Sequence, residues 1–558
     1  MKHISRTLTM ILALCMLLVG SAFAEVNLES TFPIVTEPLC ASIAFVPAWA
    51  MVTSEYNEDT FWEIRYLRDV TGMDLKFTLI DPSVSSESIS LMMASGDLPD
   101  LVIGADLTAA EITNYAVTQG LLYPIDELLQ YMPTFSKILE ERPSIRASIT
   151  APDGHIYTFP TMSYGDYAFS FRTWINQKWL DNLGLENPTT IDELYEVLKA
   201  FKEQDANGNG DPNDEIPWSG GWDLNYNLMG TLEMAYGLPY SHNSQGLSFD
   251  YSDGKDGSTI VYSAVTDTYK ELLTFVNKLW NEGIIDPDYF TQTEIQAYAK
   301  VAEDRVGVIG ATSPDSMGSD LGTFVSMNAL TLNKGDTPIV SGYPALRDLS
   351  RGFISADADP EVAAAMANLI DYYYTDEAFI NEWYGPELDS EYDYDHTGMY
   401  YDAETKSPKY VNSGNTFWWN YKITYFNFWE VPGTTNVGNK FIEASWAESH
   451  PDSLIAQYIA DCGQYADWQQ DLIDHALKYE VEGIPAMFMS DEDSEEITML
   501  KVGLDSYSQS MVSKFVIGEA SLDTDWDAYI ATMEDYGVNE YVDMYNSYYK
   551  TFKENMAN

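Results

Sequence analysis

Oxygen-bearing side chains occupy alternate positions in the segment from Asp205 to Pro217, with glycines between several of them. Asp205, Asn207 and Asn209 have the spacing of the first, third and fifth ligands of an EF-hand-type loop, in which Gly210 permits the sharp turn. Oxygen ligands suit calcium, and the absence of cysteine and histidine nearby argues against zinc or copper. The residues that we expect to provide ligands are Asp205, Asn207, Asn209, Asp211, Asn213, Asp214 and Glu215.

The end of this segment departs from the EF-hand pattern. Position twelve, where an EF-hand loop has a bidentate Glu, is Ile216, so Asp214 or Glu215 must supply the last carboxylate. The alternative is a solvated Asn/Gly turn between two elements. We favour a structural calcium site, which would stabilise the chain and would not catalyse a reaction.

The N-terminus has the pattern of a secretory signal peptide over residues 1–24. A basic start is followed by an apolar run from Leu8 to Val19 and by Ser-Ala-Phe-Ala before Glu25. We therefore expect an extracellular or cell-envelope protein. A lipid anchor at Cys15 is not supported, because the residue before it is Leu14, which is not small.

The chain is strongly acidic, with 29 basic and 87 acidic residues and a net charge of −58. Such a charge repels phosphate backbones and anionic membranes, so nucleic acid is excluded as a partner and a soluble monomer is expected. Apart from Cys15, the cysteines are Cys40 and Cys462, which could form one bridge or remain two buried thiols.

Strands and helices alternate in the first part of the chain, which predicts an α/β fold with a parallel sheet. The expected strands are Cys40–Val46, Leu75–Ile80 and Leu101–Ile103, and the expected helices are Asp59–Val70, Ser85–Ala94 and Ala109–Gln119. Ligands of such sheets collect beyond the carboxyl ends of the strands. Pro47–Trp49 and Gly104–Asp106 are therefore expected to face a cleft.

Periodicity also predicts the elements of the rest of the chain. An amphipathic helix over Ile191–Gln204 begins with a capping box at Thr190 and leads directly into the metal loop. The other expected elements are a hairpin at Asp153–Pro160, strands at Ala168–Ile175 and Arg305–Ile309, and helices at Tyr269–Asn281, Pro360–Tyr374, Glu495–Gly518 and Trp526–Glu554. The strand at Arg305–Ile309 is expected to return toward the first lobe.

Several short motifs occur in an order that resembles the family 1 extracellular solute-binding proteins, over nearly the whole chain after the signal peptide. They are Trp62 with Thr71-Gly72, Ser95–Asp100, Asp153–Tyr157, Trp179–Leu185, Leu198–Lys202, Leu279–Pro287, Tyr384–Glu387, Lys514–Gly518 and Asp525–Tyr529. The resemblance is closest to the long subgroup that serves carbohydrate ABC transporters, whose second lobe carries a calcium loop. The lipoprotein cysteine of that family is missing here.

This resemblance implies a two-lobed periplasmic-binding-protein-like fold of type II, with a hinge between the lobes and a helical C-terminal region. The expected division is an N-terminal lobe over 25–165 with a return segment at about 300–358, a second lobe over 166–299 that continues over 359–480, and helices over 481–558. It also implies that the chain is not an enzyme. Hinge closure would capture an oligosaccharide and deliver it to a membrane permease.

The sugar site implied by the resemblance needs aromatic rings that stack on C–H faces and polar groups that bond hydroxyls. The residues that we expect there are Trp49, Asp106, Tyr164, Tyr167, Arg172, Trp222, Asp223, Trp418 and Trp419. For each ring the alternative is core packing, and for the charged side chains it is solvation at the surface.

Two alternatives to an oligosaccharide-binding protein remain. A secreted glycoside hydrolase needs only two carboxylates at a suitable distance, but H-E-x-x-H, G-x-S-x-G and phosphate-loop motifs are absent from the sequence. A binding protein for a non-sugar polar solute, such as a peptide, is the second alternative. A structural cell-surface protein would show repeats or Ser/Thr/Pro tracts, and the sequence has neither.

Overall fold

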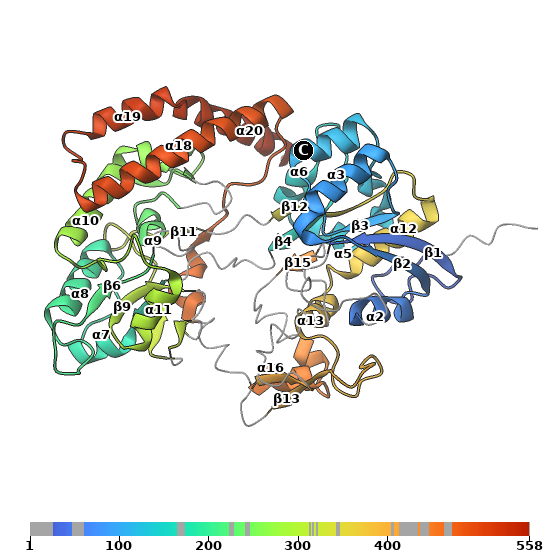
Figure 1. Ribbon diagram of the computed structural model, residues 1–558, viewed down its shortest axis with the longest axis horizontal. Coiled ribbons are helices and arrows are strands. Elements are labelled where there is room, and N and C mark those ends of the chain that lie inside the picture. Colours follow the sequence, from blue (N-terminus) through green and yellow to red (C-terminus); the bar gives the residue numbers. More distant parts are fainter. Residues whose placement is uncertain are drawn as a thin grey trace, which may run out of the picture.

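The fold is seen in a computed structural model, whose ribbon is drawn in Figure 1. It describes residues 26–46, 61–163, 173–221, 228–239, 246–311, 314, 317–319, 322–341, 346–402, 407–411, 433–435, 446–461 and 471–556. Two lobes lie side by side, each built around its own β-sheet, and C-terminal helices run along one side of the pair (Figure 1).

The first lobe contains a six-stranded mixed sheet in the order β15-β4-β12-β3-β1-β2. Its strands are β1 (Leu39–Phe45), β2 (Met73–Leu79), β3 (Leu101–Ile103), β4 (Phe159–Ser163), β12 (Leu346–Ile354) and β15 (Gly433–Thr435). The prediction of parallel pairing is confirmed for β1, which is parallel to both β2 and β3. It is wrong for the other half, because β12 arrives from late in the chain and runs antiparallel to β3 and β4.

The elements of the first lobe follow their sequence patterns. In β2, buried and exposed residues alternate, as expected for a strand with one covered face. The helix α2 (Trp62–Val70) buries Trp62, Ile64 and Leu67, and α3 (Ser85–Ser95) ends at Gly96 with φ +70°. The helix predicted over Ala109–Gln119 is α4 (Ala109–Ile112), which continues as a wider π-helical segment, η3 (Thr113–Thr118).

The remaining described elements of the first lobe come from two distant parts of the chain. They are η2 (Pro82–Val84), η4 (Ile125–Tyr131), α5 (Pro133–Glu141), α6 (Pro143–Ile149), α12 (Pro360–Tyr372), α13 (Asp376–Tyr384), β13 (Met399–Asp402), β14 (Ser407–Tyr410) and α16 (Leu454–Asp461). The hairpin predicted at Asp153–Pro160 is reduced to one bridge between Thr150 and Ile156. Phe159 instead begins β4, because this strand finds a partner in β12.

The second lobe contains a four-stranded sheet in the order β10-β5-β9-β6. Its strands are β5 (Thr173–Asn176), β6 (Ile216–Trp218), β9 (Val306–Gly310) and β10 (Phe324–Ser326). Around it lie α7 (Gln177–Leu183), α8 (Ile191–Glu203), α9 (Leu228–Ala235), α10 (Asp267–Asn281), α11 (Glu294–Ala302), η5 (Ser252–Gly254), η6 (Ser263–Val265) and the hairpin of β7 (Leu247–Phe249) with β8 (Ile260–Tyr262).

The division between the lobes differs from the predicted one. The strand β9 was expected to return toward the first lobe, but it pairs with β5 and β6 of the second sheet. Conversely, α12, α13 and α16 were expected in the second lobe, yet their buried side chains belong to the core of the first. Hydrophobic periodicity gives the type of an element, but it does not say which sheet receives it.

The chain passes between the two lobes at several places. It crosses between Ser163 of β4 and Thr173 of β5, and it crosses back between Ser341 and Leu346. A further crossing falls between Ala456 of the first core and Leu472 of the second. The two lobes are therefore joined by several segments of the chain and not by a single linker.

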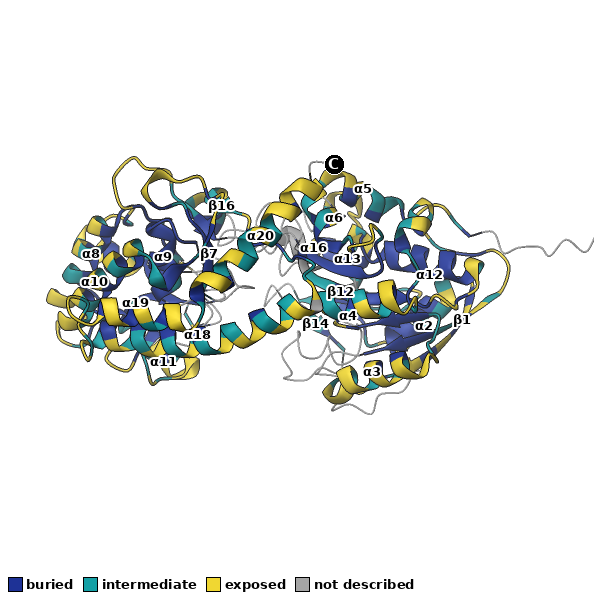
Figure 2. Cartoon of the chain, turned by 90° about the horizontal axis from the view of Figure 1, so that it is seen from above, coloured by how far each residue is buried: buried dark blue, intermediate teal, exposed yellow. Residues whose placement is uncertain are grey.

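The C-terminal region is helical, as predicted. After β16 (Glu480–Val481), which pairs with β11 (Val340–Ser341), come α18 (Asp491–Ile517), α19 (Trp526–Asp535) and α20 (Val538–Met556), and the short turn η8 (Leu477–Tyr479) precedes them. Ser490 caps α18 by accepting the N–H of Asp493 at 3.1 Å. Figure 2 shows α18 and α20 extending from the second lobe toward the first.

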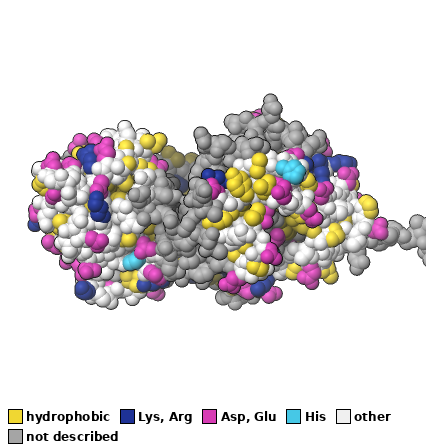
Figure 3. All heavy atoms as spheres, turned by 90° about the horizontal axis from the view of Figure 1, so that it is seen from below, with side chains coloured by type: hydrophobic (Ala, Val, Ile, Leu, Met, Phe, Trp, Pro, Cys, Tyr) yellow, Lys and Arg dark blue, Asp and Glu magenta, His cyan; other side chains and the backbone are white. Residues whose placement is uncertain are grey.

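The surface carries many acidic side chains on both lobes, as seen from below in Figure 3. Within the described part of the chain, every helix falls short of the length or the apolar character needed to cross a bilayer. Cys40 is exposed and has a free thiol, whereas Cys462 lies outside the described residues, as does the predicted signal peptide.

Candidate functional site

The predicted metal loop connects α8 to β6, two elements of the second lobe (Figure 1). Thr190 begins α8 by accepting the N–H of Glu193 at 3.2 Å, and the Glu193 carboxylate accepts the N–H of Thr189 at 3.0 Å. The apolar face of α8 buries Leu198 and Phe201 in the core. Because both ends of the loop are continuous with packed elements, the backbone that carries its polar side chains is held in place at both ends.

The first half of the loop turns its side-chain oxygens toward its own backbone. The Asn207 amide oxygen accepts the N–H of Asn209 at 2.9 Å, and the Asn209 amide oxygen accepts the N–H of Asp211 at 2.8 Å. One oxygen of Asp205 accepts the N–H of Gly210, also at 2.9 Å. The φ of Gly210 is +97°, a backbone conformation that residues other than glycine rarely adopt. The turn predicted at this glycine is therefore confirmed.

Two carboxylate oxygens in the loop are buried and have no hydrogen-bond donor, Oδ1 of Asp205 and Oε2 of Glu215. The other oxygen of Glu215 accepts the N–H of Ala206 at 2.9 Å. Burial raises the pKa of Glu215 above its ordinary value. A buried carboxylate oxygen without a donor is costly, and a cation bound to such an oxygen would remove that cost. The loop residues therefore fit a calcium ion.

The other predicted ligands are arranged differently. The Asp214 carboxylate accepts hydrogen bonds from the amides of Asn207 at 3.3 Å and Asn209 at 2.8 Å. Asp211 and Asn213 bond to each other at 3.0 Å and are exposed. Of the two candidates for the closing carboxylate, Glu215 is the one with a buried free oxygen. Its geometry suits that role better than the geometry of Asp214 does.

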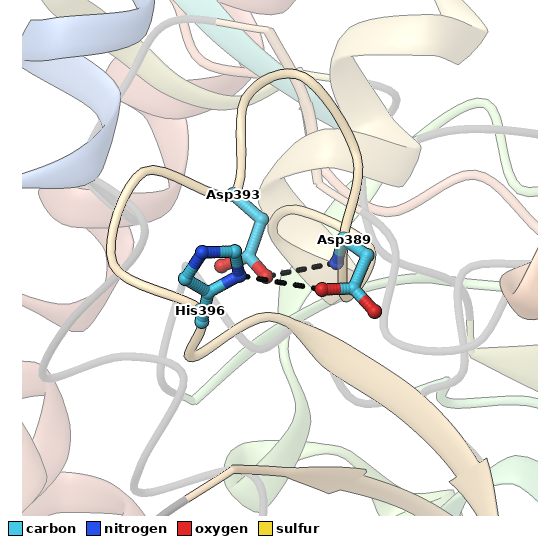
Figure 4. Close-up of side chains that lie close together, drawn as sticks. All are labelled: Asp389, Asp393 and His396. Atoms are coloured by element: carbon cyan, nitrogen blue, oxygen red, sulfur yellow. Dashed lines mark hydrogen bonds and ion pairs between the residues drawn. The ribbon is translucent and has the colours of Figure 1, made fainter.

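A second group of metal-ligating types lies in the first lobe, where Asp389, Asp393 and His396 bring one atom each within 4.8 Å of the others (Figure 4). The buried Asp393 carboxylate accepts the backbone N–H groups of Asp389 at 2.9 Å, Thr397 at 2.8 Å and Gly398 at 2.9 Å. These bonds stabilise a turn, and the turn explains why the three side chains lie close together. We assign no metal to it.

The carboxyl ends of β1 and β3 lie together, as the sequence predicted for its ligand-facing segments. A Cβ added to Gly104, whose φ is +82°, would lie 2.7 Å from the carbonyl oxygen of Val46. Only glycine allows this close approach, which places Gly104 directly against Val46. A backbone hydrogen bond also connects the two strand ends, since the Val46 N–H donates to the carbonyl oxygen of Ile103 at 3.0 Å.

Asp106, the one predicted sugar-binding residue that the structure describes, forms an ion pair with Arg351 of β12 at 3.0 Å. The Asp106 side chain is 65% exposed, so it can still reach a ligand. Arg351 also contacts Asp348 at 3.2 Å. Sequence reasoning missed Arg351, because the pairing of β3 with β12 joins residues about 250 positions apart and leaves no local pattern.

The other eight predicted sugar-binding residues lie outside the described residues. They are Trp49, Tyr164, Tyr167, Arg172, Trp222, Asp223, Trp418 and Trp419. The described residues on either side of 164–172, Ser163 and Thr173, belong to the sheets of different lobes, and the last described residues before 222 are Ser219-Gly220-Gly221 after β6.

A cavity of about 1200 Å³ lies where α5 and α6 of the first lobe meet α20. Leu139, Arg146 and Ile156 line it from the first lobe, and Phe488 and Phe552 line it from the C-terminal region. Its described lining does not include Asp106. This cavity therefore lies apart from the sheet end at which the sugar residues were predicted.

The chain matches the family of bacterial extracellular solute-binding proteins over residues 60–378, more than half of its length. It belongs to that family.

Similarity to known members extends over most of the chain. The fructooligosaccharide ABC transporter substrate-binding protein FusA of Streptococcus pneumoniae serotype 4 is 27% identical over 513 residues, which cover 88% of this chain and 87% of FusA. A structure of S. pneumoniae FusA with kestose has a TM-score of 0.62 at 23% identity and covers 92% of this chain and 100% of that chain. A FusA EF-hand mutant with fructo-nystose has the same score, identity and coverage. The predicted two-lobed fold is confirmed by these likenesses.

Proposed function

We propose that this protein is the extracellular solute-binding component of an ABC importer and that it captures an oligosaccharide between its lobes. The observation that carries the proposal is the end-to-end similarity to FusA, whose name describes a fructooligosaccharide-binding protein. Two α/β lobes with repeated crossings between them are the architecture that such capture needs. The partner would be a membrane permease that receives the closed form, and the protein would act as an exported monomer without catalysis.

The proposed sugar site lies beyond the carboxyl ends of β1 and β3 and extends to the second lobe. Asp106 and its partner Arg351 offer a carboxylate and a guanidinium for sugar hydroxyls. Trp222, Asp223, Trp418 and Trp419 are proposed as stacking and polar partners on the basis of sequence alone. The list is completed by Trp49, Tyr164, Tyr167 and Arg172.

The loop over residues 205–215 is proposed to hold a structural calcium ion. The support is the pair of buried, unpartnered oxygens of Asp205 and Glu215, together with the similarity to FusA, for which an EF-hand mutant has been solved. A bound ion would fix the loop between α8 and β6, which leads into the Ser219 segment. Mass spectrometry of the purified protein under native conditions, before and after chelation, is expected to show the mass loss of one calcium ion. An unchanged mass would show that the loop holds no calcium ion and is only a turn between α8 and β6.

Two other functions compete with oligosaccharide capture, a secreted glycoside hydrolase and a binding protein for a non-sugar polar solute. A thermal-shift screen of the purified chain against fructooligosaccharides, other oligosaccharides, amino acids and short peptides separates the ligand classes. We expect stabilisation by at least one oligosaccharide, because a ligand that binds only the folded state raises the melting temperature. Stabilisation by peptides alone would favour the non-sugar solute.

A further inference from the structure

Asp286 is a buried carboxylate that gathers four hydrogen-bond donors beneath the segment after β6. Its side chain accepts the Ser219 hydroxyl at 2.6 Å, the Lys300 ammonium at 2.8 and 3.0 Å, the Gln292 amide at 3.0 Å and the N–H of Asp288 at 3.0 Å. Its side chain has no exposed surface, whereas that of Lys300 is 17% exposed. Burial raises the pKa of Asp286, but the bonds from Lys300 and Ser219 outweigh this, so the pKa lies below its ordinary value.

Two side chains of the turn after Asp286, Gln292 and Tyr289, form hydrogen bonds with the backbone on both sides of residues 222–227. On the earlier side, the Gln292 amide donates to the carbonyl oxygen of Gly220 at 2.5 Å, next to Ser219. On the later side, the hydroxyl of the buried Tyr289 accepts the N–H of Leu228 at 2.8 Å. Gly220 lies against the Tyr289 ring, and a Cβ there would be 3.4 Å from Cε2.

A buried ion pair is a weak source of stability, because the cost of removing two charges from water offsets most of their attraction. In some proteins such a pair instead restricts the groups that it bonds to few alternative arrangements. Asp286 bonds groups on three segments, which are Ser219 after β6, the turn at Asp288 to Gln292, and Lys300 of α11. Such an arrangement is suited to holding a ligand-binding segment in one conformation.

We propose that Asp286 is a positioning residue for sugar binding, which acts through Ser219 and Gln292 to fix the backbone that leads into Trp222 and Asp223. This inference rests on the proposed oligosaccharide function. Lys300 keeps Asp286 ionised and in place, and Tyr289 fixes the point at which the chain leaves the same segment at Leu228.

The test compares sugar affinity in single and double variants, with the sugar that stabilises the wild-type chain in the thermal-shift screen. We expect Asp286→Asn to weaken binding about tenfold, equivalent to about 1.4 kcal/mol at 25 °C. Trp222→Ala is also expected to weaken binding. If Asp286 acts through the Trp222 segment, Asp286→Asn in the Trp222→Ala background should weaken it by less than about twofold further.

The matched control is Asp250→Asn, which also removes a buried carboxylate bonded to a lysine of the second lobe, Lys255, at 2.6 Å. Its sugar affinity is expected to equal that of the wild type. Should Asp286→Asn fail to fold, Gln292→Leu serves instead, because it removes the bonds from Gln292 to Gly220 and to Asp286 and leaves the Asp286–Lys300 pair intact. We expect a reduction of about threefold, equivalent to about 0.7 kcal/mol.

Three results would overturn the inference. They are wild-type affinity in the Asp286 variant or its substitute, no effect of Trp222→Ala, and fully additive losses in the double variant. Each of these leaves the oligosaccharide function standing, because the wild type still binds sugar. If the wild type binds none of the sugars, the proposed function fails and this inference fails with it.

Discussion

The buried oxygens of Asp205 and Glu215 lack donors, and this separates their loop from the turn at Asp393. Both segments bring several polar side chains together. In the turn, both oxygens of the Asp393 carboxylate accept backbone N–H groups, three in all. Because an unpartnered buried carboxylate oxygen is the costlier state, the loop is the segment that gains from a cation.

Replacement of Glu215 tests whether its carboxylate binds the proposed calcium ion. In Glu215→Gln we expect the gain of stability on addition of calcium to disappear, because the amide cannot close the cage with a charge. For the wild type that gain is about 2.7 kcal/mol at a calcium concentration one hundred times the Kd. Urea denaturation with calcium and with chelator measures it.

The control for this variant is Asp256→Asn, which alters an exposed carboxylate that accepts the N–H of Ser258 at 3.0 Å in a comparable turn of the second lobe. It should retain the full calcium effect. Equal calcium gains in wild type and Glu215→Gln would exclude Glu215 as a ligand.

Glu233 gives a prediction on pH, because this carboxyl lies wholly inside the second lobe. Burial raises its pKa from 4.5 to about 8, and a hydrogen bond with Tyr269 offsets part of the rise. The folded state therefore holds the proton more tightly than the unfolded state. Stability contributed by the protonated group is complete below pH 4.5 and is lost as the pH rises toward 8.

We expect Glu233→Gln to remove this loss, because the amide keeps a hydrogen-bonding group and does not ionise. At pH 8 the variant should be more stable than the wild type, by up to a few kcal/mol, and the difference should shrink toward pH 5. Urea denaturation across this range is the measurement. Glu271→Gln, at an exposed position of α10, should follow the wild type. A constant difference at all pH values would contradict the assignment.

At the scale of residues, spacing alone predicted the loop over residues 205–215 as a candidate calcium site, since its oxygens come from one short segment. Groups assembled from distant segments were not predictable. Arg351 meets Asp106 only because β12 pairs with β3, and Asp286 meets Ser219 only because residues 284–286 lie beside β6. The sequence around Arg351 and around Asp286 contains no local pattern that predicts these contacts.

The helix α20 is an element that contacts both lobes. Asn546 bonds both backbone groups of Ile260 on β8, accepting its N–H at 3.0 Å and donating to its oxygen at 2.8 Å. Farther along, Phe552 and Met556 line the same cavity as Arg146 and Ala147 of α6. The helix is thus fastened to the second lobe and reaches the first.

We expect Asn546→Ala to loosen this attachment, because it leaves two backbone groups of β8 without their partner. The expected cost is about 1–3 kcal/mol. Hydrogen exchange of the β8 and α20 amides should rise in the variant. The control Asn281→Ala removes an exposed amide of α10 that bonds within its own helix at 2.9 Å. Unchanged exchange in Asn546→Ala would show that the attachment lies elsewhere.

At the scale of elements, the sequence predicted those whose pattern is local. The strands β1 and β3 and the helices α8 and α10 follow directly from apolar periodicity and capping residues. The assignment of β9 and α12 to lobes was wrong, because a buried apolar strand or helix fits either core. Only the tertiary pairing of β12 with β3 and β4 decides where the chain returns.

At the scale of the whole molecule, two sheets with separate cores are joined by several crossings and by the C-terminal helices. Capture by such a molecule requires that the ligand favour the closed arrangement over the open one. We expect the radius of gyration, measured by small-angle X-ray scattering, to fall when a stabilising oligosaccharide is added. A sugar that gives no thermal shift is the control, and it should leave the scattering unchanged. Binding without compaction would contradict hinge closure.

We propose above all that the protein binds an oligosaccharide and returns it unaltered. Calorimetric titration of the purified chain with kestose and other oligosaccharides, followed by chromatography of the recovered sugar, tests it most directly. We expect saturable binding of at least one of them, with a stoichiometry of one and a sugar of unchanged length. Shortened sugar would indicate a glycoside hydrolase, and the absence of binding to every oligosaccharide would contradict the proposed function.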